Sequence, residues 1–171
     1  MNSIFYAQNV VIRPEVVTVT WGSRMVVKNN STRRMNVSPS TCYVHAIDEN
    51  GMYHQTSFSG SNIISGRGSY SYTDSYSLNL DAGSSIIGFY VDFDSLNISP
   101  ESATIGSITD FSVQFIYYDG NYNSTSYGLT GNGQLQPNKH TTDEFTYSLG
   151  PLPTSGNMMA SEVIVNFNWS N

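Results

Sequence analysis

The stretch SYSYTDSYSLNL, residues 69–80, decides the fold class of this chain. Its tyrosines and leucines occupy even-numbered positions, whereas serine, threonine and asparagine occupy odd-numbered ones. Because successive side chains of a β-strand point to opposite faces, the alternation predicts a strand with one face in a core and the other in water. Asp74 breaks the apolar series. Either a β-bulge turns it outward, which we favour, or hydroxyl groups satisfy it in a buried place.

The same alternation recurs along the chain and predicts further core-facing sets. These are Val17, Val19 and Trp21; Phe111, Val113, Phe115 and Tyr117; Phe145, Tyr147 and Leu149; and Val163, Val165, Phe167 and Trp169. Residues 86–93 are almost continuously apolar, which is typical of a central strand. Within that strand we expect Ile87, Phe89, Val91 and Phe93 to face the main core. Residues 25–27 and 42–47 are two shorter candidates.

The residues between these runs favour turns. All six prolines lie there, where a missing amide donor does not interrupt a strand ladder. Asp119 and Gly120 predict a hairpin turn, and Ser99 and Pro100 begin at most one helical turn. We therefore predict an all-β, single domain over residues 1–171. It should be a two-sheet β-sandwich or jelly roll of about eight to ten antiparallel strands with essentially no helix.

Composition excludes several classes of protein. The chain has 171 residues, 39% hydrophobic and only 12% charged, with a net charge of −6, which argues against a nucleic-acid partner. Cys42 is the only cysteine, so no intramolecular disulfide can form. No apolar run of about 18 residues predicts a membrane-spanning helix, and the first residues do not resemble a signal peptide. We expect an extracellular location or the surface of a virion.

Motifs of catalysis and cofactor binding do not stand out in the sequence. It has no His-Glu-x-x-His, no phosphate-binding loop and no Gly-x-Ser-x-Gly. Residues 66–68, Gly-Arg-Gly, begin like a dinucleotide fingerprint, but no predicted helix follows them. Cys42 and His45 are three residues apart and should lie on opposite faces of a strand. We expect no cofactor and no enzyme activity, with Cys42 as a small buried apolar residue.

Asp92 and Asp94 form the strongest candidate for chemistry. They share a predicted strand face with Tyr90, and two carboxylates at this spacing can act as acid and base on a glycoside. With Asn97 they could also provide oxygen ligands for calcium. The third interpretation, which we favour, is that the strand leaves the core at Asp92 and its acidic residues face water or form a protective edge.

Positive charge is concentrated in residues 24–34. Arg24, Lys28, Arg33 and Arg34 are four of the seven basic residues, and they predict a site for an anion or a membrane surface. The other interpretation, which we favour, is a solvated turn at residues 29–32 whose charges only keep an edge soluble.

A polar, aromatic segment spans residues 117–140. Loops of this length are uncommon unless they bind something or lack fixed structure, and one short strand is expected near Leu129. Tyrosine rings beside amides suit sugars and protein surfaces. The candidate ligand-binding residues are Tyr118, Asn121, Tyr122, Asn123 and Tyr127. A flexible loop without a ligand is the alternative.

Three functions are consistent with these features. We expect a non-catalytic recognition or assembly module: a lectin or adhesin that binds a glycan or a cell-surface receptor, or an accessory structural protein of a virus or phage particle. The alternative is a pore-forming cytolysin that binds membranes through residues 25–37, similar to a lipid-facing strand pair. A glycan-active hydrolase using Asp92 and Asp94 is the third. Residues 4–19 are apolar enough to exchange a strand with a neighbour, so we expect a homo-oligomer.

Overall fold

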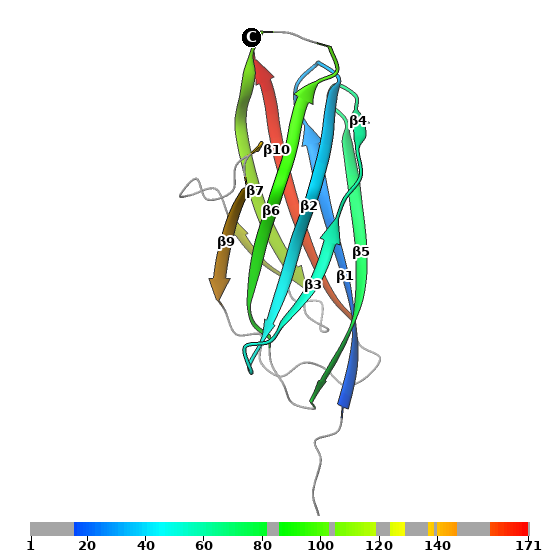
Figure 1. Ribbon diagram of the computed structural model, residues 1–171, viewed down its shortest axis with the longest axis vertical. Coiled ribbons are helices and arrows are strands. Elements are labelled where there is room, and N and C mark those ends of the chain that lie inside the picture. Colours follow the sequence, from blue (N-terminus) through cyan, green and yellow to red (C-terminus); the bar gives the residue numbers. More distant parts are fainter. Residues whose placement is uncertain are drawn as a thin grey trace, which may run out of the picture.

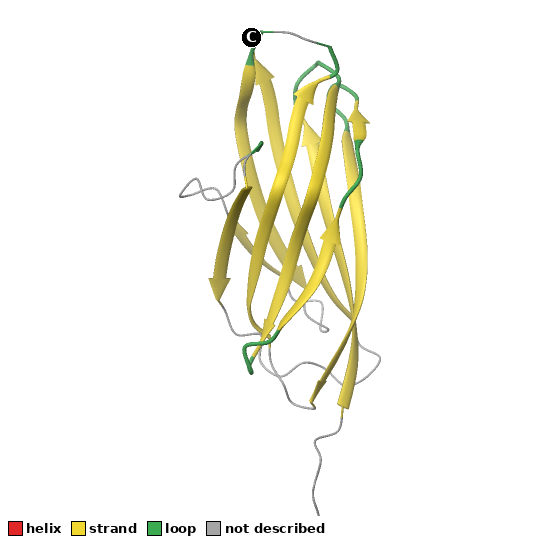
Figure 2. Cartoon of the chain, viewed as in Figure 1, coloured by secondary structure: helices red, strands yellow, loops and turns green. Residues whose placement is uncertain are grey.

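The computed structural model describes the backbone of residues 16–81, 86–102, 105–118, 124–128, 137–138, 140–146 and 158–170. These residues form strands and connecting turns, with no helix among them (Figure 2). The strands are β1 (Val16–Asn29), β2 (Met35–Asp48), β3 (Tyr53–Phe58), β4 (Asn62–Ile64), β5 (Ser69–Asp81), β6 (Ile86–Pro100), β7 (Ser107–Tyr118), β8 (Ser124–Gly128), β9 (His140–Thr146) and β10 (Met158–Ser170). The predicted all-β fold class is confirmed.

The strands form two sheets that pack face to face (Figure 1). The first sheet has the order β5-β1-β10-β7-β8, and the second has the order β3-β2-β6-β9, with β4 paired to β2. β1 and β10 run parallel, contrary to the expectation of antiparallel strands throughout, and the other described pairs are antiparallel. The strand that begins the described chain and the one that ends it are therefore neighbours at the centre of one sheet.

The core lies between the inward faces of the two sheets. Trp21 of the first sheet packs near Phe89 of the second, with ring centroids 6.2 Å apart, and Phe89 packs on Phe115 at 4.7 Å. The predicted inward residues that are confirmed as buried are Val19, Trp21, Tyr72, Leu78, Leu80, Phe89, Val91, Phe93, Val113, Phe115, Tyr117, Val163, Val165 and Phe167. Phe111 and Trp169 are partly buried against this core. Phe145 lies on β9 opposite Phe89, but its side chain and that of Val17 are not described, and Tyr147 and Leu149 lie outside the described residues.

Three predicted positions differ from the observed ones. Ile87 is 38% exposed because it is the extra residue of a β-bulge: Asp48 pairs with Ile86, whereas Ile47 pairs with Gly88. Tyr70 and Tyr76 are also exposed, at 41% and 43%. They lie on the edge strand β5, and the short strands β3 and β4 cover only part of its inward face.

Residues 99–100 do not begin a helical turn. Both complete strand β6 and continue its pairing with β2.

Asp74 keeps its inward position without a bulge, so the favoured prediction for this residue was wrong. The β1–β5 register runs unbroken through the Ser23–Asp74 pair. The Asp74 Oδ2 atom accepts a hydrogen bond of 2.9 Å from the backbone N–H of Ser57 in β3. A backbone amide, rather than the expected hydroxyl, therefore satisfies the carboxylate. This bond ties the edge strand of one sheet to the edge strand of the other.

Candidate functional site

Four aromatic side chains gather on the outer face of the second sheet. Tyr43 and His45 come from β2, Tyr53 from β3 and Tyr90 from β6. The His45 ring centroid lies 5.8 Å from that of Tyr43, 5.7 Å from that of Tyr53 and 5.4 Å from that of Tyr90. Tyr53 and Tyr90 are 6.1 Å apart, and Tyr53 is 50% exposed. We call these four residues the aromatic patch.

Strand alternation places the aromatic patch on the surface. Cys42, Val44 and Ala46 of β2 are fully buried in the core, so the residues between them must point outward. His45 lies directly opposite Tyr90 in the β2–β6 register. Neighbouring rings at cross-strand positions stabilise a sheet face, and tilted arrangements like these are preferred over flat stacking. The outward positions of Tyr43 and His45 therefore follow from the burial of their neighbours in β2.

Asp92 and Asp94 lie on the same outer face, on the central strand β6. Asp92 is directly opposite Tyr43, and Asp94 is opposite Thr41. Asp94 is exposed, in agreement with the expectation that the acidic residues face water. The strand does not leave the core or form an edge here, however, because β6 is flanked by β2 and β9 and its Leu96 and Ile98 are buried. The carboxylates project outward from a strand that remains in the core.

The electrostatics of this face are acidic. Burial lowers the pKa of His45 below its ordinary value of 6.5, and the nearby Asp92 charge opposes that shift without cancelling it. His45 is therefore mainly neutral at pH 7. The sequences of β2, β3, β4, β6 and β9 contain no lysine or arginine. A ligand approaching the aromatic patch meets aromatic rings and negative charge.

Cys42 is separated from this surface, as predicted. It is buried, and burial, with added repulsion from Asp92 and Asp94, raises the pKa of its thiol to about 12. His45 lies on the opposite face of β2. Within the described part of the chain, no three histidine, cysteine or acidic side chains come together as a metal site would require. Calcium binding and glycoside hydrolysis by Asp92 and Asp94 stay untested predictions.

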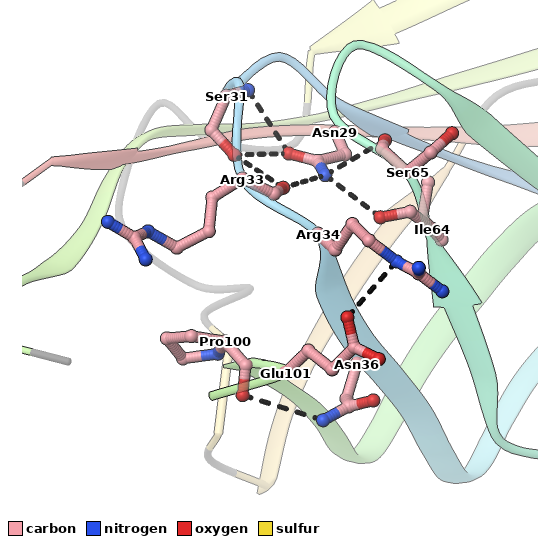
Figure 3. Close-up of polar contacts among 9 residues, drawn as sticks. All are labelled: Asn29, Ser31, Arg33, Arg34, Asn36, Ile64, Ser65, Pro100 and Glu101. Carbon is pink, nitrogen blue, oxygen red and sulfur yellow. Dashed lines mark hydrogen bonds and ion pairs between the residues drawn. The ribbon is translucent and has the colours of Figure 1, made fainter. Parts of the chain in front are cut away.

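The predicted basic site does not form a single cluster. Arg24 pairs with Glu162 of β10, and Arg34 pairs with Glu101 at 3.0 Å. The guanidinium groups of Arg33 and Arg34 point away from one another (Figure 3). Lys28 is exposed on β1. Anion binding by these residues stays a prediction, with two of the four arginine and lysine side chains already paired to carboxylates.

The segment proposed as a lipid-facing strand pair has a different structure. Residues 25–29 belong to β1 in the first sheet, and residues 35–37 belong to β2 in the second sheet. The chain crosses from one sheet to the other between them, so they do not pair with each other. Residues 25–37 therefore do not form a strand pair, and membrane binding by them stays a prediction.

This crossing is held by a buried asparagine that sequence reasoning missed (Figure 3). The Asn29 side chain accepts hydrogen bonds from the Ser31 N–H at 3.1 Å and the Ser31 hydroxyl at 2.5 Å. Its amide nitrogen donates to the carbonyl oxygens of Arg33, Ile64 and Ser65 at 2.8, 3.2 and 3.1 Å. Asn29 and Ser31 are 1% and 4% exposed, whereas Asn30 and Thr32 are exposed, so the expected solvated turn is anchored by two buried, hydrogen-bonded residues.

The Gly-Arg-Gly stretch at residues 66–68 completes that corner. A Cβ atom on Gly66 would lie 2.3 Å from the Thr32 carbonyl oxygen, and the Arg67 N–H donates to the Ser31 carbonyl oxygen at 2.8 Å. Arg67 adopts a φ of 61°, an unusual value for a side-chain-bearing residue. Gly66 therefore permits the close approach between the two turns, whereas a Cβ atom on Gly68 would lie 2.7 Å from the Ser65 hydroxyl of its own turn.

The loop candidates lie largely outside the described residues. β7 and β8 pair antiparallel, with Tyr118 opposite Ser124 and Phe115 opposite Tyr127, so a short strand lies at Ser124–Gly128, next to Leu129. Asn121, Tyr122 and Asn123 are not described, nor are the side chains of Tyr118 and Tyr127. Ligand binding by this loop stays a prediction.

Comparison of the chain with protein families, with curated proteins and with solved structures finds no match. Among the described residues there is no helical segment with the length and apolarity needed to cross a bilayer.

Proposed function

We propose that this chain is a non-catalytic recognition module that binds a glycan through the aromatic patch. The observation that carries the proposal is the set of three tyrosine rings within 6 Å of the His45 ring on an outer sheet face. Aromatic rings cover the apolar C–H faces of sugars, and tyrosine hydroxyls exchange hydrogen bonds with sugar hydroxyls. A rigid sheet supports such rings at little entropic cost on binding.

The charge of this face narrows the class of glycan. Asp92 and Asp94 lie beside the aromatic patch, on strands without basic residues, so a carboxylated or sulfated sugar would be repelled. We therefore propose a neutral glycan, or one that carries amino groups, as the ligand. Sialic acid carries a carboxylate, so this proposal predicts that the outer face does not bind sialylated glycans.

A glycan array containing neutral, amino and acidic oligosaccharides tests the proposal. The wild-type protein should bind members of the neutral or amino set. Tyr53→Ala should reduce affinity for the same glycans by about tenfold or more, a loss of about 1.4 kcal/mol or more. Tyr76→Ala is the matched control, because Tyr76 is similarly exposed but lies on β5. An array with no binding, or equal binding by wild type and Tyr53→Ala, would contradict the proposal.

The module would act outside the cell or on the surface of a virus or phage particle, as a lectin or adhesin. A homo-oligomer would present several copies of a weak sugar site and raise avidity without new contacts. Size-exclusion chromatography with light scattering tests this part separately. A trimer or larger closed assembly would support it, and a monomer at all concentrations would contradict it.

A further inference from the structure

A groove lined by serine, asparagine and apolar side chains lies on the same outer face, toward the other end of β2. Asn36 and Ser38 of β2 form one wall, and the opposite wall comes from Ser61, Asn62 and Ile63 at the start of β4. The groove is open to solvent and has a volume of about 540 Å³. Ile63 is 49% exposed and gives the groove one apolar surface.

Beside the groove, asparagine and serine side chains alternate across the β2–β6 pair. Asn36 lies opposite Ser99 and Ser38 lies opposite Asn97 across the β2–β6 pair. The Ser38 and Ser61 hydroxyls are hydrogen-bonded at 2.9 Å, which connects the two walls.

The amide nitrogens of Asn36 and Asn62 both donate hydrogen bonds within the protein. The Asn36 amide nitrogen donates to the Pro100 carbonyl oxygen at 3.5 Å, and the Asn62 amide nitrogen donates to the Tyr72 hydroxyl at 3.3 Å. Asn36 lies opposite Ile63 on the outer face, so its amide oxygen is the acceptor that can face a ligand. Asn62 lies opposite the buried Val37, and its side chain reaches inward to Tyr72. Amide oxygens and paired hydroxyls match the hydroxyl groups of a sugar.

The groove and the aromatic patch share one face because β2 changes its alternation between them. Ser38 and Tyr43 are five residues apart, a spacing that places side chains on opposite faces of a regular strand. Val37 and Pro39 are buried, however, and so are Cys42 and Val44, so the inward parity switches between these pairs. The switch lies opposite Ser95 of β6, which has a φ of 66°.

We propose that the groove is a second sugar subsite and that the ligand is a linear oligosaccharide lying along β2. This inference rests on the proposed function of the aromatic patch. Five residues of strand span about 17 Å at about 3.3 Å per residue, a distance that several linked sugars cover and a disaccharide does not. The side chains between the two subsites, Ser40 and Thr41, are small and polar. Affinity should therefore increase with chain length.

Calorimetric titration with glucose, N-acetylglucosamine and mannose oligomers, from disaccharide to hexasaccharide, tests this inference. For the sugar series that binds, the hexasaccharide should bind about tenfold more tightly than the disaccharide. Ser61→Trp fills the groove from an exposed position, and it should reduce hexasaccharide affinity to the disaccharide value without changing disaccharide binding. Asn36→Ala, which removes an amide without adding bulk, should produce part of the same loss. Ser77→Trp, on the outward face of β5, is the control.

The outcomes separate this inference from the proposed function. Disaccharide and hexasaccharide affinities that are equal would overturn the second subsite and leave the aromatic patch in place. Unchanged hexasaccharide binding by both Ser61→Trp and Asn36→Ala, with wild-type melting temperatures, would also overturn it. Failure of the wild-type protein to bind any glycan on the array or in solution would overturn both.

Discussion

At the scale of single residues, Asn29 carries the crossing between the two sheets. It is buried, its amide oxygen accepts from Ser31 and its amide nitrogen donates to three carbonyl oxygens, so alanine would remove hydrogen bonds from the backbone of two turns. We expect Asn29→Ala to lower the free energy of unfolding by about 2 to 3 kcal/mol. Chemical denaturation measures this value. The neighbouring Asn30 is exposed, and Asn30→Ala should change it by less than about 0.5 kcal/mol. Equal effects of the two substitutions would contradict the role assigned to Asn29.

His45 reports the electrostatics of the aromatic patch. Burial lowers its pKa, whereas Asp92 raises it, so the pKa should be below 6.5 in the wild type and lower still in Asp92→Asn. An NMR titration of the imidazole resonances measures both values. Because the folded protein binds a proton here less readily than the unfolded chain, the contribution of His45 to stability decreases as pH falls through 6.5. A His45 pKa above 6.5, or an increase in Asp92→Asn, would contradict this description.

At the scale of elements, the edge strand β3 is held by the Asp74 carboxylate. Its bond to the Ser57 N–H covers a donor that the edge of a sheet would otherwise present to solvent. Asp74→Ala should therefore accelerate hydrogen exchange at the Ser57 amide and lower stability by about 1 to 2 kcal/mol. The exchange rates of β10 amides in the sheet centre serve as the internal reference. Unchanged exchange at Ser57 would show that the carboxylate does not hold this edge.

The contact between the two turns at the crossing makes a second prediction at this scale. Gly66→Ala would place a methyl group within 2.3 Å of the Thr32 carbonyl oxygen, and a backbone atom cannot move aside cheaply. We expect this substitution to destabilise the protein by about 1 to 3 kcal/mol. Gly22→Ala is the matched control, because a Cβ atom on Gly22 meets no other atom within 4 Å. Thermal unfolding of both variants compares them, and equal melting temperatures would contradict the packing described here.

Elements and their inward faces were largely predictable from the sequence, because alternation reports burial directly. Residues 111–117 and 163–169 illustrate this. The exceptions have local causes. Ile87 is exposed by a bulge that depends on the pairing partner, and Asp74 is satisfied by a backbone amide from a distant strand. The local sequence around Ile87 or Asp74 does not reveal these partners, because they depend on which strands become neighbours in the fold.

The aromatic patch could have been predicted only in part. The buried parity of residues 42–46 places Tyr43 and His45 on an outer face, and Tyr90 shares the face of Asp92 by the same rule. What brings Tyr53 and Tyr90 together beside His45 is the strand order β3-β2-β6 and the registers of its two strand pairs. Strand order is a property of the whole fold, so no single stretch of sequence reveals the patch.

At the scale of the whole molecule, the two sheets have different surfaces. The outer face of the second sheet combines aromatic rings, carboxylates and an amide-lined groove, and its strands contain no lysine or arginine. The basic residues Arg24 and Lys28 lie on the first sheet, and Arg33 and Arg34 lie at the crossing. This division is the basis of our proposal that one side of the sandwich recognises neutral or amino sugars.

The most direct test of that assignment is an NMR titration of the isotopically labelled protein with the best-binding oligosaccharide from the array. The chemical shifts that change should belong to Tyr43, His45, Tyr53 and Tyr90, and with longer oligosaccharides also to Asn36 and Ser38. Shift changes confined to residues 117–128, or to the outward face of the first sheet, would contradict the assignment and move the binding site away from the aromatic patch.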